Sequence, residues 1–223
     1  MSIYTCNKQN TKAVIKGIDI CVIMCYNYIQ LKGGRKMKYI KIEELSYVSQ
    51  KGKSVTKDNK GNFYAVAYTN IENGKIDFEK LLKCNLSNAY MDLKMYDIEK
   101  GDIILPPITR KNLVIKQLDD FESQSNMIYS SRAIYIRVNP NIYNAKFLYH
   151  LLSTEKYKNK LLNEVYSDGS YIDTYQISIE RLKNFKLPKI PIEEQNKILE
   201  KENKITMQIN KLQEELLALY EEI

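Results

Sequence analysis

The sequence predicts an α+β fold, in which a body with a mixed sheet is followed by one long C-terminal helix. Three observations support this prediction: short β-rich segments separated by turn residues fill residues 38–138, helical periodicity begins near residue 144, and a heptad pattern of apolar residues closes the chain. The 223 residues suffice for a buried core, and the 44% hydrophobic and 27% charged content is that of a globular protein.

The first 36 residues do not continue smoothly into this pattern. Residues 32–36, KGGRK, directly precede Met37, and a purine-rich ribosome-binding site would encode such a run if it were translated in frame. We hypothesise that native translation begins at Met37 and that residues 1–36 are an N-terminal extension. The alternative is a short N-terminal helix, and a native protein whose mass starts at Met1 or Ser2 would exclude our hypothesis.

Four segments in the first part of the body have the composition of strands: residues 38–42, 62–68, 101–105 and 133–138. The second places Tyr64, Val66 and Tyr68 on one face. The third follows a turn at Gly101 and stops at two prolines. The intervening stretches 51–62 and 71–75 carry lysine, asparagine and glycine, which favour loops and hairpin turns.

Helical periodicity then completes the body, which we assign to residues 37–190. Asn144 is a suitable N-cap for a helix that ends near residue 153, and a second helix covers residues 156–165. A polar turn at residues 167–170 and a short helix over residues 177–185 follow. Residues 187–191 are predicted to be extended, because each proline disfavours helix at the residue before it.

Residues 191–223 form the clearest element, a helix whose apolar residues are spaced by seven, four, three, four, three and four. We call these residues the apolar seam: Ile198, Ile205, Ile209, Leu212, Leu216, Leu219 and Ile223. Gln195 and Glu202 occupy the two positions where the heptad turns polar. The seam is narrow and surrounded by charges, which favours a coiled coil with another chain, a dimer, over packing on the body, the alternative.

The charge of the chain is unevenly distributed. The total is +7, but residues 192–223 hold four lysines and eight glutamates, which gives −4, so the first 191 residues carry +11. A basic body with an acidic tail predicts a polyanion as partner for the body and a protein as partner for the tail. The alternative is a lysine-rich composition that reflects an AT-biased genome.

The cysteines and the single histidine do not indicate a metal centre. The four cysteines form no disulfide framework, and Cys21 with Cys25 lacks a second pair of ligands because the only histidine is the distant His150. Reduced thiols fit a cytoplasmic protein. The apolar run of residues 18–29 is too short to span a bilayer, so we expect no membrane partner.

No catalytic centre is predicted, and we expect that the chain is not an enzyme and holds no cofactor. Pro106-Pro107 lacks the flanking residues with which an adenine methyltransferase grips its base, and no glycine-rich loop has phosphate-binding spacing. Asp119 and Asp120 lack the lysine of a metal-dependent nuclease motif and fit a solvated loop. His150 lies in an apolar helix, where a packed histidine is expected.

Residues suited to DNA binding are better represented. Eighteen tyrosines are interleaved with lysine and arginine, a composition that suits contacts with phosphates, sugars and bases. The candidate DNA-contact residues lie in four predicted loops: Lys51, Lys53 and Lys57; Arg110, Lys111 and Asn112; Ser130 and Arg132; and Ser170 and Tyr171. Arginine and asparagine can bond guanine and adenine in the major groove, whereas the lysines suit phosphates.

Three motifs together resemble those of type I restriction-modification specificity subunits: GDIIL at residues 101–105, NAKFLYHLL at residues 144–152, and LPKIPIEEQNKI at residues 187–198. The last is similar to the junction where the target-recognition domain of that family enters its coiled-coil helix. The likeness extends from about Met37 to the C terminus, and the order and spacing of the motifs are more specific than any one of them.

The resemblance implies a non-catalytic subunit that recognises double-stranded DNA and directs methyltransferase (M) and restriction (R) subunits. S-adenosylmethionine, ATP and magnesium would belong to those partners. Pro188 and Pro191 would stiffen the exit to the helix, whose length would then set the distance between two half-sites. The competing hypotheses are a stand-alone or truncated DNA-binding or decoy protein without methyltransferase partners, and a nuclease of unfamiliar type.

The chain departs from the family pattern in two ways. Full-length members carry two recognition domains and two helices, whereas this chain has one of each. We therefore expect either a half-subunit, whose helix pairs antiparallel with a second copy or a second half-subunit, or a truncated copy. In addition, many members have a glycine-rich turn after the GDIIL strand, where this chain has residues 106–112, PPITRKN. This second departure leaves the base-contacting residues open.

Overall fold

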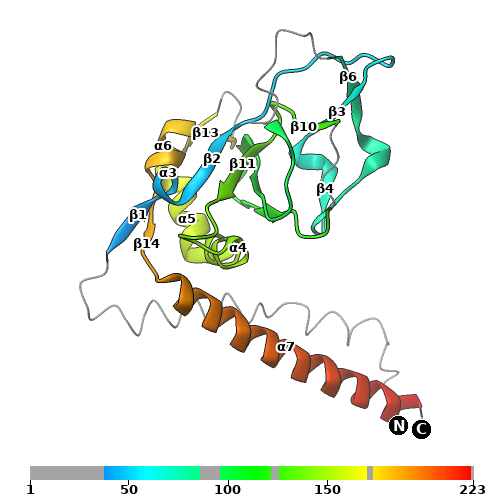
Figure 1. Cartoon of the computed structure of the whole chain (residues 1–223), viewed down its shortest axis with the longest axis vertical. Helices are drawn as coiled ribbons and strands as arrows, with labels where there is room; N and C mark the ends of the chain where they lie inside the picture. The colour runs from blue at the N-terminus through cyan, green and yellow to red at the C-terminus, as the bar shows by residue number, and fades with distance from the viewer. Residues whose placement is uncertain (1–37, 86–95, 122–125, 170–172, 222–223) are drawn as a thin grey trace.

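The computed structural model describes residues 38–85, 96–121, 126–169 and 173–221, and it confirms an α+β body with a long C-terminal helix (Figure 1). The first half contains β1 (Tyr39–Lys41), α3 (Ile42–Leu45), β2 (Ser46–Lys51), β3 (Phe63–Val66), η1 (Tyr68–Asn70), β4 (Ile71–Glu72), β5 (Lys75–Ile76), η2 (Phe78–Lys80) and β6 (Leu82–Cys84). The second half contains β7 (Ile103–Leu105), β8 (Ile108–Thr109), β9 (Lys116–Gln117), β10 (Met127–Tyr129), β11 (Ile134–Val138), α4 (Ala145–Ser153), α5 (Glu155–Glu164), β12 (Tyr166–Asp168), β13 (Tyr175–Ile177), α6 (Ile179–Asn184), β14 (Lys186–Pro188) and α7 (Ile192–Glu221).

An antiparallel sheet of order β2-β11-β7-β9 lies at the centre of the body. A second sheet, β10-β3-β6, is mixed, because β10 pairs with β3 in parallel and β6 pairs with β3 antiparallel. A third sheet has the order β12-β13-β8. Finally, β1 pairs with β14, which places the start of the body beside the exit to α7. Many of the paired strands are therefore distant from one another in the sequence.

The central sheet separates two hydrophobic clusters. Residues alternate along β11, so that Ile134 and Ile136 belong to one cluster while Tyr135 belongs to the other. The first cluster also contains buried residues of α4, α5 and α6, such as Phe147 and Leu161. The second is built from β3, β10 and the segments around them. Because β11 is buried on both faces, it is nearly all apolar, which is why the sequence indicates it so clearly.

The predicted helix at residue 144 is confirmed as α4. The Asn144 side chain accepts a hydrogen bond from the Phe147 N–H at 3.2 Å, which satisfies one of the free donors of the first turn. The Thr154 hydroxyl caps α5 in the same way through the Tyr157 N–H at 3.3 Å. The predicted turns also appear, since Asn73 and Gly74 both have positive φ between β4 and β5, and Gly101 has a φ of +91°.

Two predicted elements have a boundary that differs from the prediction. The strand predicted over residues 62–68 stops at Val66, and Tyr68 begins a 3-10 turn, although its ring still packs on the second cluster. The helix predicted from residue 177 begins at Ile179, because Ile177 is the last residue of β13 and Ser178 is the N-cap. In both cases a partner strand or a cap fixes the boundary, and neither is visible in local periodicity.

Candidate nucleic-acid interface

The loop after β2 lies against the loop between β10 and β11. The Gly52 N–H donates to the Ala133 carbonyl at 3.0 Å, and the Lys53 N–H donates to the Tyr129 carbonyl at 2.8 Å. A Cβ atom on Gly52 would collide with the Ser130 carbonyl, so this close approach requires glycine. The approach brings together two of the predicted groups of DNA-contact residues: Lys51 and Lys53 with Ser130 and Arg132.

The side chains of these four residues differ in exposure. Lys51 and Arg132 are exposed, whereas Lys53 is half-buried, with its ammonium 5.9 Å from the centroid of the Tyr96 ring. Ser130 is only 7% exposed, and its hydroxyl accepts a hydrogen bond from the Arg132 N–H at 3.3 Å. Ser130 therefore shapes the turn that carries Arg132, and solvent reaches mainly the two fully exposed cations.

A second basic group lies where β3 meets β6. Lys57 forms an isolated antiparallel β-bridge with Cys84, and the Asp58 N–H donates to the Lys83 carbonyl at 3.0 Å. Lys57 and Lys83 are therefore neighbours, although they are far apart in the sequence. Both lysines are exposed. The Lys83 ammonium lies 5.6 Å from the Tyr64 ring centroid. Sequence reasoning missed Lys83, because the three-residue strand β6 is too short to show alternation.

The loop after β8 carries the third predicted group. Arg110, Lys111 and Asn112 are all exposed. Thr109, which precedes them, is paired with Tyr175 of β13, so the loop lies beside the β12–β13 hairpin. Ser170 and Tyr171, the fourth predicted loop group, lie outside the described residues. Of the four predicted groups, the structure thus places Lys51 and Lys53 beside Ser130 and Arg132. That any of these residues contacts DNA stays a prediction.

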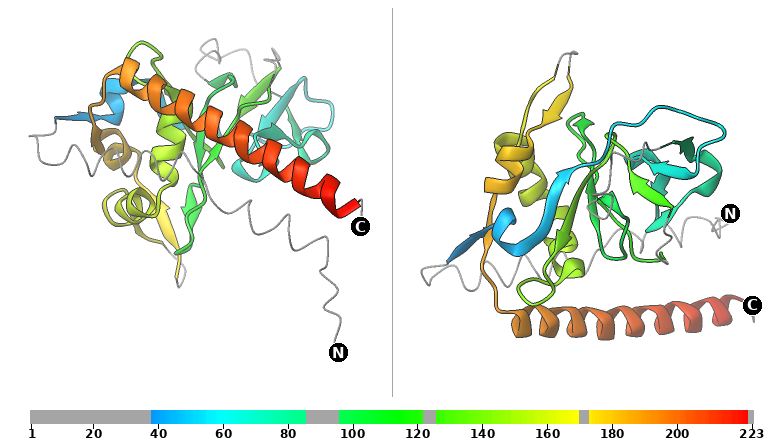
Figure 2. Two further views of the ribbon diagram at one scale, coloured as in Figure 1. Left: turned by 90° about the horizontal axis from the view of Figure 1, so that it is seen from below. Right: turned by 45° about the horizontal axis from the view of Figure 1, so that its top comes forward.

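These loops share one side of the body. Figure 2 shows the connection from β2 to β3 and the β12–β13 hairpin on the side of the body away from α7, and Figure 1 shows the same arrangement. The backbone of these two connections is therefore separated from the acidic C-terminal helix. This side combines exposed cations with loops that are joined by backbone hydrogen bonds, which suits contacts to a phosphate backbone.

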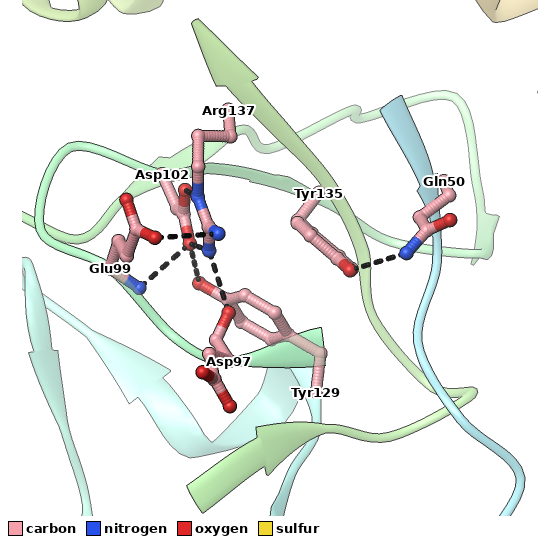
Figure 3. Close-up of polar contacts among 7 residues, drawn as sticks. All are labelled: Gln50, Asp97, Glu99, Asp102, Tyr129, Tyr135 and Arg137. Carbon is pink, nitrogen blue, oxygen red and sulfur yellow. Dashed lines mark hydrogen bonds and ion pairs between the residues drawn. The ribbon is translucent and has the colours of Figure 1, made fainter. Parts of the chain in front are cut away.

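A buried polar network holds the strands beneath these loops (Figure 3). The Arg137 guanidinium donates to both carboxylate oxygens of Asp102, at 2.9 and 2.8 Å, and forms an ion pair with Glu99 at 2.8 Å. The Tyr129 hydroxyl donates to the same Asp102, which is fully buried, at 3.0 Å. This guanidinium is occupied by carboxylates and is only 11% exposed, so it fixes β11 to β7 rather than offering a charge to a ligand.

Two stacked tyrosines belong to this network. The rings of Tyr129 and Tyr135 have centroids 4.4 Å apart, and the Tyr135 hydroxyl accepts a hydrogen bond from the Gln50 amide at 2.7 Å. Burial raises the pKa of Tyr135 to about 12, and burial with the nearby Asp102 carboxylate raises the pKa of Tyr129 well above its usual value. Both phenols therefore stay neutral near physiological pH and keep the loops in place.

The start of α7 is joined to the body through Gln195, which is fully buried. Its amide nitrogen donates to the Ile190 carbonyl at 2.7 Å, and its amide oxygen accepts from the Asn144 N–H at 2.8 Å. Two turns later, the Lys146 ammonium donates to the Glu202 carboxylate at 3.0 Å. The two polar positions of the heptad thus bond to α4, which explains why they are not apolar.

The apolar seam divides into a covered part and an exposed part. Ile198 is 7% exposed and belongs to the first hydrophobic cluster of its own chain. Of the remaining described residues of the seam, Ile209 is half-buried, whereas Ile205 is 37%, Leu212 63%, Leu216 45% and Leu219 60% exposed. From Ile205 onward, α7 therefore carries an apolar face that its own body does not cover, among the residues that the structure describes.

Two further observations bear on the alternatives. Within residues 38–85, 96–121, 126–169 and 173–221, no three His, Cys, Asp or Glu side chains gather where a metal ion could bind. No helix in that part of the chain combines the length and the apolar composition needed to cross a membrane.

Comparison with solved structures identifies proteins of similar fold, whereas no protein-family model and no curated protein matches the chain. One similar structure, reported for the assembly and conformational transition of the type I restriction-modification system, is 21% identical over 81% of this chain, with a TM-score of 0.52. The HsdS subunit from Thermoanaerobacter tengcongensis is 12% identical over 86% of this chain, with a TM-score of 0.53. The chain spans 45% and 44% of these two proteins, so the shared fold extends over less than half of each.

Proposed function

We propose that the chain is a non-catalytic DNA-recognition subunit of a type I restriction-modification system. The observation that carries this proposal is an exposed apolar seam on a helix fixed to a body with the fold of an HsdS subunit. The body recognises one half of a bipartite DNA target. The second half is recognised by another subunit, which pairs with the free part of α7.

The surface of the body supports a role in DNA binding. The first 191 residues carry a net charge of +11, and exposed cations occur on paired loops, among them Lys51, Arg110 and Arg132. Lysines at Lys57 and Lys83 suit phosphate contacts, which are independent of sequence. Arg110, Asn112 and Arg132 suit contacts with base edges, where guanidinium and amide groups discriminate between bases.

The helix supports a role in assembly. Seam residues between Ile205 and Leu219 follow the spacing of a two-stranded coiled coil, and all of them except the half-buried Ile209 are exposed in the single chain. The methyltransferase and restriction subunits then assemble on the paired subunits. They supply S-adenosylmethionine, ATP and magnesium chemistry, while this chain supplies sequence specificity. We assign recognition to residues 37–190 and pairing to residues 191–223.

Co-purification tests this function. The chain, expressed with an affinity tag in its own host, is expected to retain a DNA methyltransferase subunit in stoichiometric amount. The matched control is the Leu212→Glu variant, which is expected to lose the second recognition subunit. A chain that binds DNA but retains no methyltransferase would instead be a stand-alone or decoy DNA-binding protein. Metal-dependent cleavage of DNA by the purified chain alone would show a nuclease.

The methylome of the host provides an independent test. Deleting the gene is expected to remove adenine methylation from one bipartite motif and to leave every other modified motif unchanged. Complementation with the intact chain restores the motif, because specificity resides in this subunit. A methylome that is identical with and without the gene would contradict the proposal.

A further inference from the structure

The three-stranded sheet β12-β13-β8 has one buried and one exposed face. Tyr166 and Ile177 are directly paired, and both are buried against the first hydrophobic cluster. The neighbouring pair, Ser167 and Gln176, points to the other face, because side chains alternate along a strand. Both of these residues are exposed. The sheet therefore offers a free outer face on a framework that the core holds rigid.

One row of side chains crosses that outer face. Gln176 is paired with Ser167 on one side and with Ile108 of β8 on the other. Directly paired residues share a face, so the three side chains form a row, which we call the outer row. Ile108 is 52% exposed, an unusual environment for an isoleucine in a strand. In the described part of the chain, the Gln176 side-chain amide has no hydrogen-bond partner.

The dimensions of the outer row suit a DNA groove. Neighbouring strands lie about 4.8 Å apart, so a row across three strands is roughly 10 Å wide. The major groove of B-form DNA is about 12 Å wide and admits a β-ribbon. In Figure 2 the β12–β13 hairpin extends away from α7, on the same side as the loop after β2. Access of a duplex to the row is therefore not obstructed by the helix.

The chemistry of the row matches one kind of base pair. A glutamine amide can donate from its nitrogen to adenine N7 and accept through its oxygen from the adenine N6 amino group, and an aliphatic side chain can contact the thymine methyl group. Gln176 and Ile108 are direct neighbours and supply one group of each kind. Ser167 bonds either kind of base and adds little discrimination.

Charge around the row favours the same partner. Arg110, two residues after Ile108 and exposed, lies next to the row, and Lys111 follows it. Asp168, the acidic residue of β12, directly follows Ser167 in the sequence. It is paired with Tyr175, so it belongs to the face of the sheet opposite to the outer row. The cations are thus near the outer row, while the strand's carboxylate is directed elsewhere.

We propose that the outer row, Ile108 and Gln176 in particular, recognises an A·T base pair in the major groove. This inference rests on the proposed function in DNA recognition and assigns its specificity to residues on a sheet, in addition to the loops. Gln176 bonds the adenine edge, and Ile108 packs on the methyl group of a thymine. Lys111 holds a neighbouring phosphate, and Arg110 contacts a base edge next to the row.

Selection from a random duplex pool tests the proposal. The full chain is incubated with the pool at low salt, and bound sequences are read out. Wild type is expected to enrich a motif with a required adenine, and Gln176→Ala is expected to reduce the preference for that adenine by about tenfold. The matched control is Gln208→Ala, an exposed glutamine of α7, which leaves the motif unchanged.

A second measurement changes the DNA and leaves the protein intact. Replacing the thymines of the selected motif with uracil removes only the methyl groups, and wild type is expected to bind about fourfold more weakly. Ile108→Ala is expected to bind the thymine and uracil duplexes equally. If wild type enriches a motif that neither variant alters, and discriminates no uracil, the outer row is not a base-contacting element. If wild type enriches no motif, DNA recognition itself is refuted, and this inference with it.

Discussion

The two ends of α7 use one continuous heptad pattern in different ways. Over its first three turns, Gln195 and Ile198 are buried against the body, at 0% and 7% exposed. Over the remaining turns, Leu212 and Leu219 are 63% and 60% exposed. The difference teaches that heptad spacing alone does not identify a pairing surface. Polar residues in the heptad mark where the helix is bonded to its own chain, and the uninterrupted apolar part marks what is left for a partner.

Two truncations test this division most strongly. A chain that ends at Asn203 is expected to retain most of the unfolding free energy of the body, because none of the described residues after Asn203 is buried. A chain that ends at Pro191 is expected to lose about 3–6 kcal/mol, since it uncovers the surface beneath Ile198 and Leu199. Urea unfolding of both chains provides the measurement. Equal stability of the two would show that the first turns are not part of the body.

Leu212→Glu tests the exposed part. A charge placed in the middle of the seam is expected to weaken self-association by at least about 100-fold, because it would be buried without a partner. Met207→Glu is the matched control, since Met207 is 72% exposed on the same helix but lies outside the seam. Sedimentation equilibrium measures both. A wild-type chain that stays monomeric at high concentration would exclude a second copy as the partner.

Gln195→Leu tests the joint between the two parts. The substitution leaves the half-buried Asn144 N–H and the buried Ile190 carbonyl without their partners, so the free energy of unfolding should fall by about 2 kcal/mol. Asn196→Ala removes a single exposed hydrogen bond to Asn144 and should have little effect. Thermal and urea unfolding compare the two variants. An unchanged stability for Gln195→Leu would mean that water replaces the lost bonds.

Lys146→Ala is expected to have the smallest effect. Its ion pair with Glu202 joins α4 to the third turn of α7, but the lysine side chain is 45% exposed. Solvent screens such a pair, so the loss should be about 0.5 kcal/mol and should shrink at high salt. Unfolding at two salt concentrations checks this dependence. A loss that does not respond to salt would indicate packing by the lysine stem instead.

Much of this architecture could be predicted from the sequence. The α+β class, the strand at residues 134–138, the capped helix α4 and the long α7 all have strong local patterns: an apolar run, an N-cap asparagine, and heptad spacing. Strands β12 and β13 were not predicted. Each has three residues, and their assignment depends on pairing with each other and with β8, some 60 residues away. Local periodicity contains no information on such partners.

The candidate site could be predicted only in part. The exposed loop residues Arg110 and Arg132 were identified by residue type, because cations next to strands suit DNA. Sequence reasoning could not place Lys57 beside Lys83, nor Ile108 beside Gln176, because both neighbours arise from strand pairing. Nor could it divide the seam, because Ile198 and Leu212 have the same spacing and similar side chains. Burial, which depends on α4, distinguishes them.

The joint at Gln195 has a consequence for how such chains can be recombined. Genetic exchange that cut the chain at Pro191 would transfer a body without the amide that satisfies the Asn144 N–H and the Ile190 carbonyl. A crossover between Asn203 and Ile205 would transfer the body together with the turns bonded to it. The exchangeable module therefore includes the first three turns of α7, and on the proposed function, chimaeras joined at that point are expected to inherit a new DNA target while keeping the old partner.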